Sequence, residues 1–309
     1  MTQEALSPET CAALRDAGLD AGEVVRVVTA ALDEDFRYGP DVTSAATVAG
    51  RALTADVVAR QAGVLAGVPV ALAVLDLAGG LCGDPCGGLV ARTVLVQDGA
   101  RIGPGDAVLR VSGPATAVLG AERTMLNFLT RLSGIATATR AWADAVAGTG
   151  AVIRDTRKTT PGLRVVEKYA VRCGGGQNHR MGLGDAALIK DNHVAAAGGV
   201  AAAVAAVRSA APGVTLEVEC DSLAQVREAL AAGARFLLLD NMGLDALREA
   251  VAEARRRDGV RLEASGGLRL ATAREVAATG VDYLSVGALT HSSPALDLGL
   301  DYADQDGAG

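Results

Sequence analysis

Residues 153–193 read IRDTRKTTPGLRVVEKYAVRCGGGQNHRMGLGDAALIKDNH and contain every lysine of the 309-residue chain. The lysines are Lys158, Lys168 and Lys190; subtracting these three from 29 basic residues leaves 26 arginines. Residues 151–190 carry eight Lys or Arg against three acids, a local charge of +5 in a chain of net charge −7. An acidic protein with one basic segment is suited to holding a small anion, and its overall charge disfavours nucleic acid as a partner.

The same segment begins and ends in short apolar runs that are each followed by polar residues. Alternation of such runs with Ala/Arg/Glu-rich helical stretches predicts a parallel sheet, and so many units in succession favour a complete or incomplete (β/α) barrel. An open doubly wound sheet is the alternative. The barrel is favoured because the polar residues fall at the C-terminal end of each run, where the groups of a barrel active site converge. Six runs show the pattern: AVIRDTRK (151–158), AALIKDNH (186–193), VTLEVECDS (214–222), RFLLLDNM (235–242), VRLEASGG (260–267) and DYLSVGAL (282–289).

The N-terminal third has a different pattern. Residues 7–10, SPET, predict a capped helix start because a serine precedes a proline in the first turn, and residues 23–36 continue with helical spacing. Residues 53–67 and 88–119 are rich in Val, Leu and Thr and are broken by Gly, Pro and Asp. These runs are typical of an antiparallel sheet with tight turns.

A further helix is predicted from residue 121 onward. Its apolar spacing places Met125, Leu129 and Leu132 on one face. Gly134 is a candidate for a break in this helix.

The composition is that of a folded protein, with 50% hydrophobic residues and no run of about 18 uncharged apolar residues. The first 20 residues have neither the basic start nor the apolar block of a signal peptide. We therefore expect a cytoplasmic protein that has no membrane partner.

The five cysteines are odd in number and scattered, which argues against a disulfide framework. Cys82 and Cys86 lie in the glycine-rich stretch GGLCGDPCGG, with no second Cys or His cluster nearby. A surface loop is therefore favoured over a zinc site at residues 79–88.

The expected strand ends carry groups of different charge in chain order. Early strands bring cations, middle strands bring carboxylates, and the last two bring glycines whose backbone N–H groups can hold a phosphate. Two carboxylates opposite several cations is the arrangement expected for a divalent metal shared with a diphosphate. The residues are Arg157, Lys158, Lys190, Glu217 or Glu219, Asp240, Ser265, Gly266, Gly267 and Gly287.

Some of these choices have structural alternatives. Glu217 and Glu219 share a strand face, and Glu219 is chosen because it lies nearer the strand end. A buried network of Glu, Asp, Lys and Arg can also be purely structural. His179 is balanced between a core and a functional role, whereas His193 and His291 favour structural roles. Lys168 is expected on a helix, as a solvated charge or a partner of Glu167, and the fingerprint-like GLGDAA at residues 182–187 is rejected because no strand precedes it.

The chain resembles the carboxylating nicotinate-nucleotide pyrophosphorylases, also called quinolinate phosphoribosyltransferases. The motifs in common, in order, are ERTMLNFLTRLSGIAT, DTRKTTPGLRVVEKYAVRCGGGQNHRMGL, IKDNH, LEVEC, LLLDNM and EASGG. The resemblance implies a pentosyltransferase that makes nicotinate mononucleotide, CO2 and diphosphate from quinolinate and 5-phosphoribosyl 1-diphosphate. It also implies an N-terminal open-faced α/β sandwich (residues 1–126, with 292–309 packing back on it) followed by an incomplete (β/α) barrel (127–291).

The resemblance also implies roles for single residues. Glu219 and Asp240 would face the ribose and a diphosphate bound to Mg²⁺, contacting the metal directly or through water, and Lys158 would also contact the phosphoribosyl diphosphate. Ser265, Gly266, Gly267 and Gly287 would hold the 5-phosphate. A homodimer, or a larger assembly, is expected in which the N-terminal domain of one subunit caps the barrel of the other and Arg60 reaches across. The residues expected around quinolinate are Arg60, Arg123, Arg157, Lys158, His179, Arg180 and Lys190.

Two questions of chemistry stay open at the level of sequence. Lys158 or Lys190 is expected to protonate C2 of the pyridine ring after decarboxylation, because an ammonium loses a proton far more readily than a guanidinium. A relative associated with molybdenum transport that acts on another substrate, a Schiff-base lyase using Lys190 and a non-catalytic anion-binding protein are the alternative functions.

Overall fold

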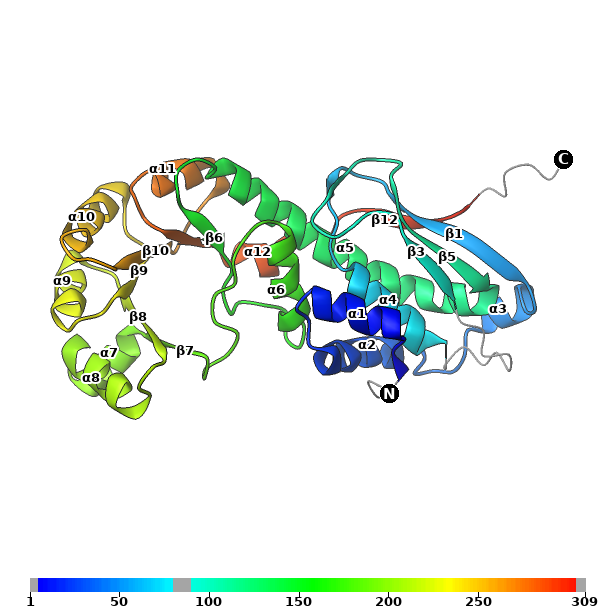
Figure 1. The fold of residues 1–309 in the computed structure, drawn as a ribbon, viewed down its shortest axis with the longest axis horizontal. Coiled ribbons are helices and arrows are strands. Elements are labelled where there is room, and N and C mark those ends of the chain that lie inside the picture. Colours follow the sequence, from blue (N-terminus) through cyan, green and yellow to red (C-terminus); the bar gives the residue numbers. More distant parts are fainter. Residues whose placement is uncertain (1–4, 80–89, 304–309) are drawn as a thin grey trace. The chain divides into compact units, whose positions relative to one another are not determined.

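The computed structural model describes residues 5–79 and 90–303, and contacts divide the chain into two compact units (Figure 1). Unit 1 holds the described residues of Met1–Ala138, Thr160–Gly174 and Ser292–Gly309. Unit 2 holds Thr139–Thr159 and Gly175–His291. The predicted domain boundary at residue 126 differs from this division, because residues 127–138 and 160–174 make their contacts within unit 1. Cys82 and Cys86 lie outside the described residues, so the predicted loop is not described.

Unit 1 contains an antiparallel four-stranded sheet in the order β12-β1-β5-β3. Alternate residues of β1 are buried, from Leu53 to Ala59, and the other face carries polar pairs. There Arg110 donates two hydrogen bonds of 2.7 Å to the carboxylate of Asp56, its partner in the register. The strands are β1 Ala52–Ala59, β3 Ala91–Val94, β5 Ala107–Pro114 and β12 Leu298–Tyr302, with a separate pair of β2 Gly63–Val64 and β4 Arg101–Ile102.

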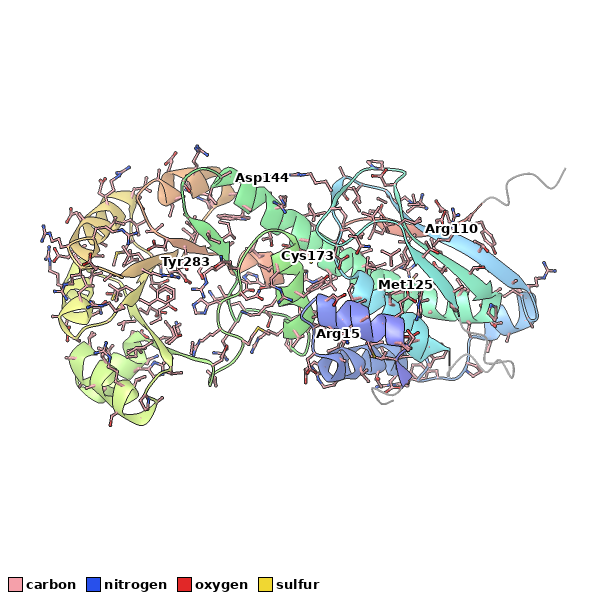
Figure 2. All side chains as sticks on the ribbon, viewed as in Figure 1. Arg15, Arg110, Met125, Asp144, Cys173 and Tyr283 are labelled. Atoms are coloured by element: carbon pink, nitrogen blue, oxygen red, sulfur yellow. The ribbon has the colours of Figure 1, made fainter. Side chains whose placement is uncertain are left out.

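Helices cover the apolar face of this sheet, which gives the open-faced α/β sandwich that was predicted (Figure 1). The helix predicted at residues 7–10 begins at Pro8, with the Ser7 side chain accepting the backbone N–H of Thr10. Met125, labelled in Figure 2, lies on the long helix α5 and is completely buried. Leu129 is also completely buried, and Leu132 is almost completely buried, as predicted for this face. The helices of this unit are α1 Pro8–Asp16, α2 Ala21–Asp35, α3 Val42–Thr47, α4 Val68–Ala78, α6 Arg164–Cys173 and most of α5 Ala115–Ala145.

The break expected at Gly134 is wrong, because α5 is continuous. A Cβ atom on Gly134 would lie 2.0 Å from the carbonyl oxygen of Pro294. Glycine is needed here so that the C-terminal segment can approach the helix backbone.

Lys168 on α6 is completely buried, which excludes the solvated charge, one of the two roles left open by the sequence, and leaves a structural role. The neighbouring Glu167 is also fully buried, and its carboxylate accepts hydrogen bonds from Arg131 and from the backbone and hydroxyl of Thr160. Helical periodicity could not show this burial, because it assigns a side chain to a face of the helix but does not show what packs on that face.

Unit 2 is a parallel six-stranded sheet in the order β6-β11-β10-β9-β8-β7. All six predicted runs form its strands, and the helices α7 to α11 lie on its outer side (Figure 1). This confirms the predicted incomplete barrel. The strands are β6 Val152–Arg154, β7 Ala186–Ile189, β8 Thr215–Cys220, β9 Phe236–Asp240, β10 Arg261–Ser265 and β11 Tyr283–Ser285; the helices are α7 Asp191–Ala197, α8 Val200–Ala210, α9 Leu223–Ala231, α10 Leu244–Ala254, α11 Ala273–Ala277 and α12 Ala288–His291, with the 3-10 turn η2 Leu270–Thr272.

In the part of the chain that the structure describes, β6 and β7 are the two edges of this sheet. The backbone near Gln177 runs beside β6: the Gln177 N–H donates to Ile153 (2.8 Å), and the Asp155 N–H donates to Gln177 (3.3 Å). The glycine-rich block that precedes His179 therefore brings this histidine to the edge of the barrel.

Among the described residues, no single helix is both long and apolar enough to cross a membrane. The pair α7 and α8, bent by 90°, meets those criteria only when its two helices are taken together.

Candidate functional site

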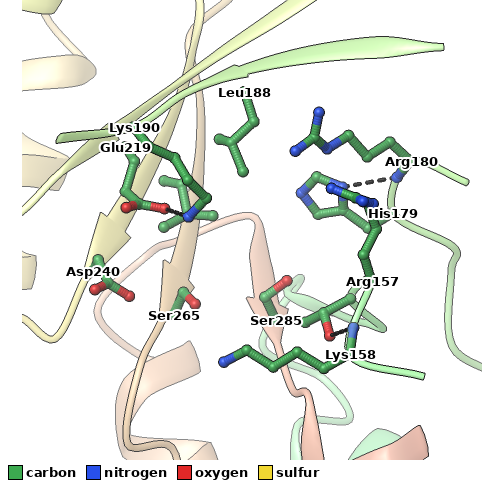
Figure 3. Close-up of a pocket in the computed structure, with 12 residues that line it drawn as sticks. Arg157, Lys158, His179, Arg180, Leu188, Lys190, Glu219, Asp240, Ser265 and Ser285 are labelled. Atoms are coloured by element: carbon green, nitrogen blue, oxygen red, sulfur yellow. Dashed lines mark hydrogen bonds and ion pairs between the residues drawn. The ribbon is translucent and has the colours of Figure 1, made fainter. Parts of the chain in front are cut away.

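A cavity of about 390 Å³ opens at the C-terminal ends of the barrel strands (Figure 3). Eight of the predicted site residues line it, and all belong to unit 2. The lining residues are Thr156, Arg157, Lys158, His179, Arg180, Leu188, Lys190, Glu219, Leu238, Asp240, Ser265 and Ser285.

The parallel register explains why these side chains converge. Asp240 and Ser265 are the last residues of β9 and β10 and are direct neighbours in the register. Lys190 follows the last residue of β7, and Glu219 lies one residue before the end of β8. Because parallel strands end at one edge, acids and cations from distant segments meet there.

The cavity contains four basic side chains, from Arg157, Lys158, Arg180 and Lys190. The Lys190 ammonium contacts the Glu219 carboxylate in an ion pair. Burial, followed by the charge of Arg157, lowers the pKa of the Arg180 guanidinium. Like charges that lie close together repel one another, so an anion bound between Arg157 and Arg180 would relieve this repulsion.

Asn241 fixes the ends of two neighbouring strands. Its backbone N–H donates to the carbonyl of Ser265 (2.9 Å), and its side-chain amide donates to Asp240 (2.6 Å). Asn241 has a φ of 56°, a conformation that is uncommon outside glycine. Gly266 and Gly267 follow with φ of 84° and 60°, so the chain turns sharply beside the cavity.

Gly287 lies against another part of the site. A Cβ atom at this position would be 3.1 Å from Cδ of Lys158 and 3.5 Å from the hydroxyl of Thr156. A side chain here would therefore press on Lys158. The predicted glycines thus follow strand ends of the barrel, although they do not themselves line the cavity.

A largely buried polar cluster adjoins the cavity, and we call it the lower layer: Arg154, Glu217, Glu263 and His179, of which His179 also lines the cavity. Arg154 donates to Glu263 (2.5 Å), while His179 Nε2 lies 2.9 Å from Oε2 of Glu217 and 3.4 Å from Oε1 of Glu263. The Arg154 guanidinium also lies over the ring of Tyr283, 4.8 Å from its centroid; Tyr283 is labelled in Figure 2.

The two glutamates of the lower layer have perturbed acidities. Burial raises the pKa of Glu217 to about 7, against the opposing effect of Arg154. Burial, and then the charge of Glu217, raises the pKa of Glu263. The sequence favours Glu219 over Glu217 as the site carboxylate of this strand, and it does not point to Glu263 or Arg154 as site residues. The period of two that places Ser265 inward also places Glu263 inward, and this signal could have identified it.

His179 is held from several directions. Its backbone N–H donates to Oδ1 of the buried Asp155 (2.8 Å), whose Oδ2 accepts the side-chain amide of Asn178 (2.6 Å). The backbone N–H of Arg180 donates to His179 Nδ1 (2.7 Å; Figure 3). In contrast, His193 Nδ1 accepts the backbone N–H of Lys190 at the start of α7, a local structural role.

Two sets of residues are candidates for a metal ion. His179, Glu217 and Glu263 place ligand atoms within 4.8 Å of one another. However, a neutral histidine that binds a metal through Nε2 carries its proton on Nδ1, and here Nδ1 accepts an N–H. The lower layer therefore does not suit a metal.

Glu219 and Asp240 suit Mg²⁺ better, because both carboxylates line the open cavity from adjacent strands. They supply only two carboxylate groups. Magnesium ions in proteins commonly take one or two carboxylates and complete their coordination with water and phosphate oxygens.

Comparison with known proteins identifies the family. The family model for the N-terminal domain of quinolinate phosphoribosyl transferase matches residues 41–133, and that for the C-terminal domain matches residues 135–301. The chain belongs to the quinolinate phosphoribosyltransferase family. A relative from Mycobacterium leprae, named nicotinate-nucleotide pyrophosphorylase (carboxylating), is 53% identical over 293 residues, covering 93% of this chain and 99% of that protein.

Two other members of the family agree with this match. A probable nicotinate-nucleotide pyrophosphorylase (carboxylating) from Bacillus subtilis is 40% identical over 87% of this chain and 89% of its own length. The solved structure of nicotinate-nucleotide pyrophosphorylase from Francisella tularensis has a TM-score of 0.84 at 37% identity, covering 91% of this chain and 96% of that one.

Two arginines predicted for this phosphoribosyltransferase site lie in unit 1. Arg123 is an exposed residue of α5, and Arg60 follows β1 and forms an ion pair with Asp301. Neither lines the cavity of unit 2.

Proposed function

We propose that the chain transfers the phosphoribosyl group of 5-phosphoribosyl 1-diphosphate to quinolinate with loss of CO2, forming nicotinate mononucleotide and diphosphate. The observation that carries the proposal is that four cations and two carboxylates line one cavity at the strand ends. Both substrates are multiply charged anions, and the family match supplies their identity.

The cations account for binding. Arginine forks can hold planar carboxylates through paired hydrogen bonds, so Arg157 and Arg180 suit the two carboxylates of quinolinate. Lys158 and Lys190 add compact charges near the same cavity. Ser265 and the turn at Gly266 and Gly267 suit the 5-phosphate, because backbone N–H groups in such turns face anions.

The first chemical step breaks the bond between C1 of the ribose and diphosphate and forms a bond from C1 to the pyridine nitrogen. Positive charge develops on the sugar, and the carboxylates of Glu219 and Asp240, which both line the cavity, would stabilise it. Mg²⁺, held by these two residues, would neutralise the leaving diphosphate. Asn241 keeps Asp240 aligned through its amide.

The second step releases CO2 from C2 and leaves an electron pair that takes up a proton. Lys190 is engaged with Glu219, whereas the Lys158 side chain extends into the cavity near Ser285 (Figure 3). We therefore favour the Lys158 ammonium as the proton donor over Lys190. Arg157 and Arg180 would keep the remaining C3 carboxylate in place.

A homodimer explains the two arginines of unit 1. If the N-terminal domain of one subunit covers the barrel of another, Arg123 and Arg60 can contribute cations to the partner's cavity. Arg60 would then exchange its ion pair with Asp301 for a substrate contact. Exposed arginines of this kind are suited to such an exchange, because surface ion pairs are weak.

Incubation of the purified chain with quinolinate, phosphoribosyl diphosphate and Mg²⁺ tests the proposal. Nicotinate mononucleotide and CO2 should form in equal amounts, and omission of either substrate should abolish both. Binding of quinolinate with no turnover would indicate an anion-binding protein. No binding would favour a relative with another substrate, such as the one associated with molybdenum transport.

The Schiff-base alternative has less support. Lys190 contacts a carboxylate, so it is held as an ion pair rather than as a free amine nucleophile. Borohydride reduction in the presence of substrate should therefore leave the mass of the protein unchanged.

A further inference from the structure

Both ring nitrogens of His179 are engaged by other parts of the barrel. Nδ1 accepts the backbone N–H of Arg180 at 2.7 Å, and Nε2 faces Glu217 at 2.9 Å and Glu263 at 3.4 Å. The side chain is only 9% exposed, and it nevertheless lines the cavity.

These contacts define where the proton lies. A nitrogen that accepts an N–H has no proton of its own, so Nδ1 is bare. Nε2 must then carry the proton of the neutral ring, and it donates that proton to Glu217, with Glu263 nearby. The backbone donor is a main-chain amide and cannot reverse its role.

Glu263 is itself held in place by two hydrogen bonds, and Glu217 is fixed by burial. Oε2 of Glu263 accepts the Arg154 guanidinium, and Oε1 accepts the hydroxyl of Ser285. Glu217 is 2% exposed, and its Oε1 has no hydrogen-bond partner among the described residues, so its contact with His179 is made through Oε2 alone. Asp155 fixes the His179 backbone, because its Oδ1 accepts the His179 N–H.

From these contacts we propose that Glu217 and Glu263 are positioning residues that hold His179 as its neutral Nε2–H tautomer in the cavity wall. Resting on the proposed function, this assigns His179 a role as a fixed, uncharged wall beside quinolinate rather than as a further cation. The positive charge that binds the two carboxylates of quinolinate would come from Arg157, Arg180 and the two lysines of the cavity. His179 also fixes the Arg180 backbone, because that N–H is bound to its ring.

The tautomer can be measured without substrate. The chain has three histidines, His179, His193 and His291, so ¹⁵N-histidine labelling of the full protein gives a simple long-range ¹H–¹⁵N spectrum. Loss of signals in His179→Asn identifies the ring of interest. At pH 7.5 the wild type should show one protonated nitrogen, Nε2. A proton on Nδ1, or on both nitrogens, overturns the proposal whatever the activity of the protein.

Two variants of Glu217 test the glutamate. Glu217→Leu removes the acceptor, and the Nε2 proton should exchange with water at least about 10-fold faster, whereas Glu217→Gln keeps an acceptor oxygen and should retain most of the protection. The signals of His193 and His291 report whether each variant is folded. Equal exchange in the wild type and both variants contradicts the proposal.

Kinetics with quinolinate then test the consequence for the site. Glu217→Leu should raise KM for quinolinate about 10-fold, with a smaller change in kcat, because a misplaced wall weakens binding. Glu217→Gln should recover most of this loss. If both variants lost the same fraction of kcat and KM for quinolinate stayed unchanged, Glu217 would be needed only for folding. Absence of turnover in the wild type would instead contradict the proposed function, and would leave the tautomer result intact.

Discussion

A Cβ atom on Gly266 would lie 2.3 Å from Oδ1 of Asn241 and 2.8 Å from its backbone nitrogen. Asn241 in turn hydrogen-bonds to Asp240 and to the carbonyl of Ser265. The two residues therefore link the turn proposed to bind the 5-phosphate to Asp240, one of the two carboxylates proposed to act in catalysis.

Gly266→Ala should lower kcat/KM for phosphoribosyl diphosphate by roughly 100-fold or more and cost about 1–3 kcal/mol of stability, because the φ of 84° and the contact with Asn241 both exclude a side chain. Steady-state kinetics and urea denaturation measure the two effects. Gly184→Ala is the matched control, since a Cβ there meets nothing within 4 Å. Similar losses in both variants would refute the coupling.

Lys158→Arg should reduce kcat by roughly 100-fold or more, because a guanidinium retains the charge but does not supply a proton. Lys190→Arg should reduce kcat by only roughly 10-fold, since its main contact is the ion pair with Glu219. The measurement is the rate of CO2 release together with the fraction of intermediate that stays undecarboxylated. A larger loss for Lys190→Arg would transfer the role of proton donor to Lys190.

Glu217 should make the stability of the protein fall as pH rises. Its pKa is about 7 in the folded protein and close to 4.5 when solvated, so the folded state binds the extra proton between these values. The stabilisation is complete below pH 4.5 and is lost through pH 7, an effect of about 3 kcal/mol.

Glu217→Gln should abolish this dependence, so the difference in unfolding free energy between variant and wild type should shift in favour of the variant from pH 5 to pH 8. Urea denaturation at both pH values measures it. Glu249→Gln removes an exposed carboxylate from α10 and serves as the control. A constant difference for Glu217→Gln would contradict the raised pKa.

Subunit mixing should restore activity if a dimer shares its sites. Arg123→Ala and Lys190→Ala should each be nearly inactive alone. When the two are co-expressed, half of the dimers are mixed and each has one intact cavity, so about a quarter of wild-type activity should return. If Arg123 acts within its own subunit, the mixture stays inactive.

Much of the barrel could be predicted from the sequence. All six strands were predicted, because each is a short apolar run and parallel strands buried on both faces leave this signal. The polar residues that follow these runs line the cavity, as predicted. Their position could be predicted because it depends only on where each strand ends, which is a local property of the sequence. The continuity of α5 was missed at Gly134, since only the approach of Pro294 explains that glycine.

The sequence by itself thus determined the alternation of strands and helices, the charges at the strand ends and the family. The tertiary structure alone decided that Lys168 is buried, that residues near Gln177 run beside β6, and that His179 meets Glu217 and Glu263. Periodicity assigns a side chain to a face, but its neighbours across a barrel depend on strand order and register, which bring together residues far apart in the chain.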